Sequence, residues 1–156
     1  MPSRKSNATR VVLSILLVAA CAAARAQSSA TEPALSHTVA DTVLQWGPCP
    51  PFMPTGCEIA VLHGDPAKPN ADVFFRVPGG AAIPAHWHTS AERMVLVSGE
   101  MKVAYAGQKP TTVPPGTYAD GPPKATHDAT GTSTAACVLF IAFEGPVDAH
   151  PVAASK

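Results

Sequence analysis

Proline and glycine interrupt this chain so often that long helices are excluded. The 156 residues include 17 prolines and 11 glycines, and a proline inside a helix removes a backbone hydrogen bond and clashes with the preceding turn. Short apolar runs of β type lie between these breakers, at 42–46, 58–63, 73–77, 93–97, 101–105, 117–119 and 136–143. Several short strands at regular spacing predict an all-β sandwich or barrel, with no internal repeat and no second domain.

The first 26 residues have the pattern of a signal peptide. Arg4, Lys5 and Arg10 precede an apolar stretch at 11–20, and Ala24-Arg25-Ala26 is a small-x-small cleavage site. About ten strongly apolar residues are too few to cross roughly 30 Å of hydrocarbon as a helix. We therefore expect an exported protein, periplasmic or secreted, without stable membrane insertion.

A second mode of cleavage stays open, because Val18-Ala19-Ala20-Cys21 resembles a lipoprotein box. Cleavage there would anchor the chain through a lipidated Cys21. In both cases we expect residues 27–40, which are rich in Ser, Thr, Ala and Pro, to form a flexible or loosely docked N-terminal arm. Residues 41–156 are then predicted to form one domain.

The balanced net charge of the chain conceals an asymmetry. Residues 1–26 hold four of the 11 basic side chains and none of the 11 acidic ones, so 7 basic side chains face 11 acidic ones in the remainder. A mildly acidic domain has no basic stripe with which to displace counterions from a phosphate backbone. Nucleic acid is therefore excluded as the main partner, and a small-molecule ligand or substrate is expected instead.

Three cysteines remain after the signal peptide. In an oxidising compartment Cys49 and Cys57 could form a disulfide across the proline-rich loop at 48–56, which would leave Cys137 unpaired. Cys137 lies in the apolar run at 135–143. We expect it to be buried and to behave as a small hydrophobic side chain.

Two histidines and a glutamate form the main candidate site. His86 and His88 stand two residues apart, so both point to the same face of a strand, whereas Trp87 points to the other, as a core or interface residue. Glu92 comes within reach if the chain turns at Thr89-Ser90 and re-enters the sheet. Two imidazoles and a carboxylate on one wall predict one divalent metal ion: Fe, Mn, Ni, Cu or Zn.

The spacing around these residues resembles the first motif of the cupin superfamily: Gly80-x5-His86-x-His88-x3-Glu92-x6-Gly99. The second cupin motif resembles this segment: Gly116-x5-Pro122-x-Lys124-x2-His127-x3-Gly131. Lys124 stands where the family usually has glycine, and Gly131 where it often has asparagine. Lys124 predicts either a changed turn or a strained left-handed residue.

The resemblance implies a single-domain jelly-roll barrel, His127 as the fourth metal ligand, and a homodimer. Small exported cupins of largely unassigned function also share three shorter segments: Trp46-Gly47-Pro48, Leu62-His63-Gly64-Asp65-Pro66 and Gly145-Pro146. These segments indicate the architecture and say little about the substrate.

Strand alternation from Glu92 predicts that Met94 and Leu96 face the pocket and that Arg93 points outward. Other candidates for the pocket wall are Phe75, Met101, Tyr105, Tyr118 and Phe140, with Arg76 as a candidate to steer an anionic substrate. The remaining histidines, predicted to be surface or turn residues, are His37, His63 and His150. An apolar pocket favours an aromatic or small apolar substrate over a sugar phosphate.

Four protein ligands leave two positions open on an octahedral ion. With Fe(II) such a site suits a dioxygenase of small organic compounds, with Glu92 as a base if it dissociates; with Zn, Mn or Ni it suits isomerase-like Lewis-acid chemistry. Two alternatives stay open: a non-catalytic metal- or ligand-binding cupin that acts as a sensor or storage module, and a barrel kept for structure or dimerisation. The ligands alone do not choose among these.

Overall fold

The computed structural model describes residues 33–153, and residues from Ser36 onward belong to one compact unit. The predicted signal peptide, its cleavage sites, Cys21 and residues 27–32 of the predicted arm lie outside the described residues. The described residues form strands, turns and irregular segments without a helix, as the prolines predict. Accordingly, they contain no helix with the length and apolarity to span a membrane.

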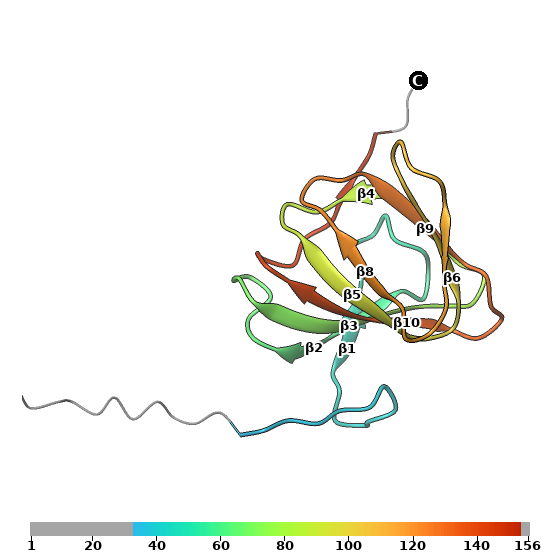
Figure 1. Cartoon of the computed structure of the whole chain (residues 1–156). Helices are drawn as coiled ribbons and strands as arrows, with labels where there is room; N and C mark the ends of the chain where they lie inside the picture. Colours follow the sequence, from blue (N-terminus) through green and yellow to red (C-terminus); the bar gives the residue numbers. More distant parts are fainter. Residues whose placement is uncertain (1–32, 154–156) are drawn as a thin grey trace, which may run out of the picture. The chain divides into compact units, whose positions relative to one another are not determined.

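Two antiparallel sheets make up this unit (Figure 1). The six-stranded sheet has the order β1 (Trp46–Pro48), β2 (Glu58–His63), β3 (Ala71–Val77), β10 (Cys137–Phe143), β5 (Glu92–Ser98), β8 (Tyr118–Gly121). The five-stranded sheet has the order β11 (His150–Pro151), β4 (Ala82–Trp87), β9 (His127–Gly131), β6 (Met101–Tyr105), β7 (Thr111–Val113). Chain neighbours are often not sheet neighbours, as expected of a jelly roll.

The main core lies between the two sheets. Val73 and Leu96 enter it from the six-stranded sheet, and Ile83 and Met101 from the five-stranded one. Alternation decides which side chains point inward: on β5 Glu92, Met94 and Leu96 are buried while the residues between them are more exposed. The predicted all-β class and barrel are thus confirmed, and the alternation on β5 places Glu92 inside.

The strand boundaries differ from the predicted ones in two respects. The prediction of a strand at 42–46 is wrong, because hydrogen-bonded pairing with β2 starts only at Trp46. The Asp41 carboxylate accepts hydrogen bonds from the amide and hydroxyl of Thr38 and closes a turn just before it. Conversely, β4, β7, β9 and β11 were not among the predicted runs, because histidine, threonine and proline dilute their apolar character.

A second apolar cluster covers the outer face of the six-stranded sheet. Leu44 packs there with Phe74 and Val138, and Val39 and Phe140 pack against them. Phe140 therefore faces away from the space between the sheets, so its prediction as a pocket residue is wrong. The chain around residues 39–44, at the end of the predicted arm, packs on this face.

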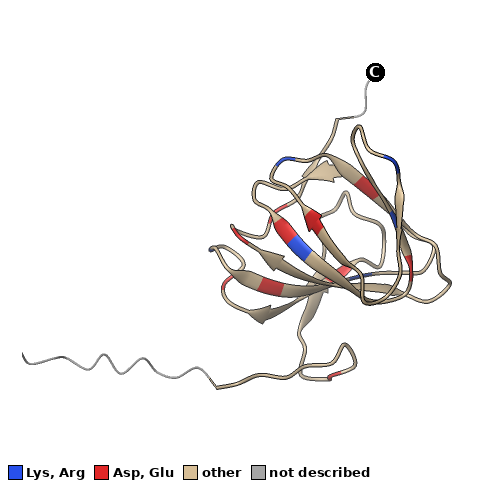
Figure 2. Cartoon of the chain, viewed as in Figure 1, with Lys and Arg blue, Asp and Glu red and all other residues tan. Residues whose placement is uncertain are grey.

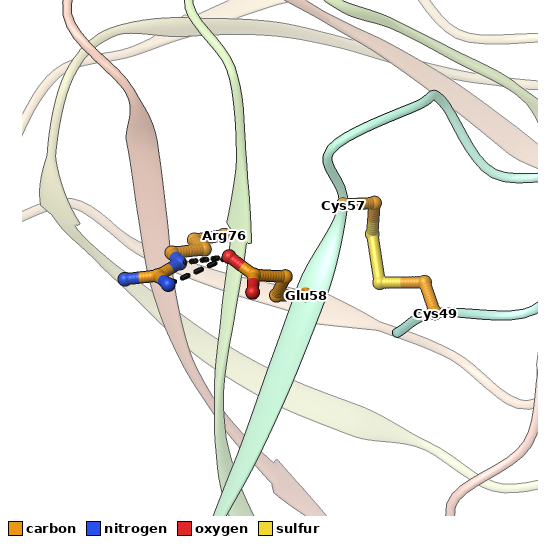
Figure 3. The surroundings of a disulfide bond; sticks show 4 residues. All are labelled: Cys49, Cys57, Glu58 and Arg76. Carbon is orange, nitrogen blue, oxygen red and sulfur yellow. Dashed lines mark hydrogen bonds and ion pairs between the residues drawn. A yellow bond between two sulfur atoms is a disulfide. The ribbon is translucent and has the colours of Figure 1, made fainter. Parts of the chain in front are cut away.

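A disulfide joins Cys49 and Cys57 and closes the loop between β1 and β2 (Figure 3). The amide of Cys49 also donates a hydrogen bond to the carbonyl of Cys57. Cys137 is a buried free cysteine, 1% exposed. Its Sγ lies 2.9 Å from the position that a Cβ on Gly99 would take, and Gly99 has a φ of +76°, so both space and backbone favour glycine there.

Candidate metal centre

Three histidines converge at one end of the space between the sheets. His86 on β4 lies opposite His127, the first residue of β9, in the strand register. His88 follows β4 directly, before the bend at Thr89-Ser90. All three side chains are buried, and one ligand nitrogen of each lies within 4.8 Å of the others.

Each imidazole is oriented by a backbone carbonyl. The Nδ1 atom of His86 lies 2.8 Å from Pro84 O, that of His127 lies 3.1 Å from Ala125 O, and that of His88 is hydrogen-bonded to Asp148 O. A carbonyl only accepts hydrogen bonds, so each Nδ1 carries the proton and donates it. The lone pair of each Nε2 is then free, which is the tautomer a metal-binding histidine needs.

Glu92 reaches the same point from the opposite sheet. Its Oε2 lies 3.4 Å from Nε2 of His88, and its Oε1 lies 3.3 Å from Nε2 of His127. The residue is 3% exposed, and Oε1 has no hydrogen-bond partner among the described residues. A buried carboxylate oxygen without a partner costs free energy unless a cation satisfies it. Three imidazole nitrogens and this oxygen fit a divalent metal ion.

Burial sets the ionisation of these groups. It raises the pKa of Glu92 to about 8, with a smaller contribution from Asp120. Burial lowers the pKa of His86 to about 4, helped by His127, and also lowers that of His88 to about 4 against the opposing effect of the Asp148 carbonyl. Near neutral pH the metal-free site therefore holds neutral imidazoles and a protonated carboxyl group.

Metal binding at pH 7 is expected to release about one proton per ion, because the carboxyl of Glu92 must ionise to bind. Apparent affinity rises with pH up to about 8, the pKa of that group, and then levels off. Titration calorimetry of Zn(II) binding in buffers of different ionisation enthalpy measures the release. The Glu92→Gln variant should release none, and equal release from both proteins would contradict this assignment.

Two neighbouring segments hold the site in shape. Lys124 adopts a left-handed conformation with a φ of +62°, which is one of the two outcomes predicted for it. Its amide donates a 2.8 Å hydrogen bond to the carbonyl of His88. Gly121 pairs with Glu92, and a Cβ there would lie 2.8 Å from Glu92 Oε1 and 2.7 Å from the Tyr105 hydroxyl. The site therefore has no room for a side chain at this position.

The Gly121→Ala variant is expected to lose about 1–3 kcal/mol of stability, because the added methyl overpacks a buried site. Metal affinity should fall about 10- to 100-fold as Glu92 is displaced. Urea denaturation and Zn(II) titration measure the two effects. Gly47→Ala is the matched control, since nothing lies within 4 Å of a Cβ there. Equal behaviour of the two variants would show that the contact at Gly121 is unimportant.

An apolar cavity of about 230 Å³ opens from the histidines and Glu92. The predicted wall residues Phe75, Met94 and Met101 line it. The other lining side chains are mostly aliphatic and come from both sheets: Ile59, Ile83, Val103, Ala129, Leu139 and Ile141. The candidate metal centre therefore forms the polar end of an otherwise apolar chamber.

Three predicted pocket residues lie elsewhere. Leu96 is 0% exposed but sits in the core beyond the cavity. Tyr118, on the edge strand β8, is 60% exposed and turned outward. Arg76 forms an ion pair with Glu58 (Figure 3). Its guanidinium carbon also lies 3.9 Å from the centre of the Trp46 ring. The alternation of side chains along one strand did not predict where these three residues lie, because their positions depend on how the neighbouring strands pack.

Tyr105 takes an intermediate position. It does not line the cavity, but its ring lies 4.9 Å from that of His127, and its hydroxyl is buried without a hydrogen-bond partner among the described residues. Burial, with the nearby Glu92, raises the pKa of this hydroxyl above its ordinary value. Tyr105 therefore packs behind the site.

The other histidines lie outside the triad. His37 is hydrogen-bonded to Asp41, and His63 is exposed at the end of β2. His150 on β11 stacks on Trp87 with ring centroids 4.2 Å apart. It is therefore a strand residue packed on β4, and Trp87 points away from the cavity as predicted.

Two parts of the cavity wall were missed by sequence reasoning. The disulfide loop contributes Cys49, Pro50 and Met53, and the segment before β11 contributes Val147 and Asp148. The Asp148 carbonyl is also the partner of His88, 60 residues away in the chain. Only the Gly145-Pro146 pair hinted at this segment, and it carried no information on contacts.

The two-sheet barrel and its inward cluster of three histidines and a glutamate define a cupin. The family model described as the ChrR cupin-like domain matches residues 35–148. The chain belongs to this family. A search of curated proteins gave no match.

Solved structures agree on the fold. DMSP lyase DddQ from Ruegeria pomeroyi is 21% identical, with 80% of this chain and 73% of that chain covered and a TM-score of 0.60. The polyketide cyclase RemF from Streptomyces resistomycificus is 18% identical, with 78% and 89% covered and a TM-score of 0.61. A structure described as oxalate oxidase is 16% identical, with 64% and 56% covered and a TM-score of 0.53. Several other matches extend over only about three fifths of the matched structure's length. At these identities the likeness shows the fold.

Proposed function

We propose that this protein is a metal-dependent enzyme that acts on a small organic compound and, when loaded with Fe(II), is a dioxygenase. The observation that carries the proposal is a buried set of three histidines and one glutamate at the end of an apolar cavity. A substrate in that cavity would meet the metal centre directly. Cupins of similar fold include proteins described as DMSP lyase and oxalate oxidase, so this barrel accommodates small-molecule chemistry.

His86, His88, Glu92 and His127 would hold the ion. Fe(II) held by such a histidine and carboxylate site would allow dioxygen to accept electrons from a bound substrate. The chain's own contribution is to keep the imidazoles neutral and aimed inward through their carbonyl partners. The apolar wall excludes water from the reacting groups.

The proposed place of action is outside the cytoplasm, in the periplasm or secreted. The signal-peptide pattern of residues 1–26 motivates this proposal. The disulfide between Cys49 and Cys57 supports it, because such bonds persist mainly in oxidising compartments.

Oxygen consumption tests the enzymatic proposal. Metal-free protein is loaded with Fe(II) under anaerobic conditions and mixed with oxygen and a panel of small aromatic and aliphatic compounds. We expect consumption that depends on both Fe(II) and one class of compound, and none from the Zn(II)-loaded protein. Metal analysis of protein purified from its own compartment identifies the resident ion. No turnover with the resident ion on any compound would contradict the proposal.

A non-catalytic ligand-binding module is the second candidate, and one observation favours it. Among the described residues that line the cavity, the four candidate ligands are ionisable, and Cys49 is held in the disulfide. Asp148 is the only other ionisable residue of this wall. Its carboxylate accepts a 2.9 Å hydrogen bond from the Thr89 amide and lies 3.2 Å from His150. No free acid or base is thus evident beside the metal centre. Stoichiometric ligand binding without turnover would support this candidate.

A further inference from the structure

Among residues 33–153, no cationic side chain lines the cavity. The wall that these residues form contains neither lysine nor arginine, and it contains no serine, threonine, asparagine or glutamine. The charged residues are few and scattered over strands and turns (Figure 2). Arg76 and Arg93, which come from two strands that border the cavity, are paired elsewhere, with Glu58 and Glu144. An anionic substrate would find no side chain of opposite charge.

The polar end of the cavity adds no cationic side chain from the described residues. Glu92 is the carboxyl group at the candidate metal centre, and the carboxylate of Asp148 is engaged by the Thr89 amide and by His150. A substrate anion buried in the apolar chamber of the metal-free protein would therefore lack a side chain that compensates its charge.

The shape and chemistry of the wall favour a ring. Met53, Met94 and Met101 line the cavity, and Phe75 and Phe143 join them. Thioether sulfurs adapt to irregular shapes and make favourable contacts with aromatic rings. An apolar cavity of about 150 Å³ is known to hold benzene, so about 230 Å³ admits one ring with a small substituent.

We propose that the substrate is a neutral, largely apolar molecule of one-ring size that presents an oxygen or other donor atom to the histidines. This inference rests on the proposed function, whose substrate class it names. It is carried by the lack of a cationic wall residue among residues 33–153 and by the apolar chamber with its thioethers and phenyl rings. Small anions such as dicarboxylates and sugar phosphates are excluded from the class.

Binding of two probes of equal size tests the proposal. Benzamide is neutral and benzoate is an anion at pH 7.5, and each is titrated by calorimetry or NMR into metal-free protein. We expect benzamide to bind at least about tenfold more tightly than benzoate, because no side chain of the wall compensates the anion. Benzoate that binds as tightly as benzamide, or binding of neither probe at millimolar concentration, would overturn the proposal.

A lysine placed in the wall makes the test specific. Met94→Lys should reverse the preference, because its ammonium group gives benzoate a partner. Val97→Lys, on the same strand but 41% exposed, is the matched control and should leave the preference unchanged. If Met94→Lys does not fold, Met53→Lys on the disulfide loop replaces it, since Met53 is only partly buried. An unchanged preference in the folded wall variant would overturn the proposal.

The two proposals fail in different ways. Lack of metal-dependent turnover would remove the enzymatic function but leave the preference for benzamide in the metal-free protein intact. A preference for benzoate would remove the proposed substrate class, whatever the turnover measured with other compounds.

Discussion

The His88→Ala variant is expected to bind no stoichiometric metal after dialysis, whereas the wild-type chain is expected to keep one ion. The substitution removes one of three convergent imidazoles and leaves the Asp148 carbonyl without its donor. Loss of an outer partner alone costs roughly 10- to 100-fold in metal affinity, so loss of a ligand should cost more. Elemental analysis and Zn(II) calorimetry measure the effect.

His63→Ala is the control for this experiment, because His63 is exposed at the end of β2. One bound ion per chain in His88→Ala would show that the proposed ligand set is wrong. Thermal denaturation adds a second readout, since an ion at 1,000 times its Kd stabilises the folded state by about 4 kcal/mol. A variant that loses the ion but keeps the full thermal stability would rule out a structural role for the metal.

Removal of the disulfide is expected to lower the free energy of unfolding by about 2–3 kcal/mol, the amount that chain entropy assigns to a loop of this size. The bond joins residues eight apart, at the two ends of a loop that lines the cavity. The double variant Cys49→Ser/Cys57→Ser should therefore also bind benzamide more weakly. Urea denaturation and probe titration measure both changes.

A reducing agent provides the control for the disulfide. It should destabilise the wild-type chain to the level of the double variant and leave that variant unchanged. Equal stability of the oxidised and reduced wild-type chain would mean that the loop holds its place without the bond, and its contribution to the cavity would then come from packing alone.

A large part of the candidate site could be predicted from the local sequence pattern. His86 and His88 share a face because side chains alternate along an extended strand, and the bend at Thr89-Ser90 returns the chain so that Glu92 faces them. The prediction of His127 came from the resemblance to the second cupin motif, because no spacing argument links it to His88, which lies 39 residues earlier in the chain. The structure brings His127 into register with His86.

The wall of the cavity was predicted less well, for a physical reason. Parity along one strand tells which residues share a face but not how far into the barrel each one lies. Leu96 shares its face with Met94 yet ends in the core, and Tyr118 is exposed on the edge strand β8. Only strand pairing and the course of the loops place such residues.

Breaker spacing and strand alternation were thus sufficient for the all-β class and for the His86, His88 and Glu92 cluster, because these features depend on neighbours a few residues apart. The choice of a barrel over a sandwich, like the prediction of His127, came from the resemblance to the cupin motifs. The tertiary structure determined the composition of the cavity wall. It placed the disulfide loop and Asp148 at the cavity, and it paired Arg76 with Glu58 outside it. These contacts join residues distant in the chain, so the neutral character of the chamber emerges only once both sheets are packed.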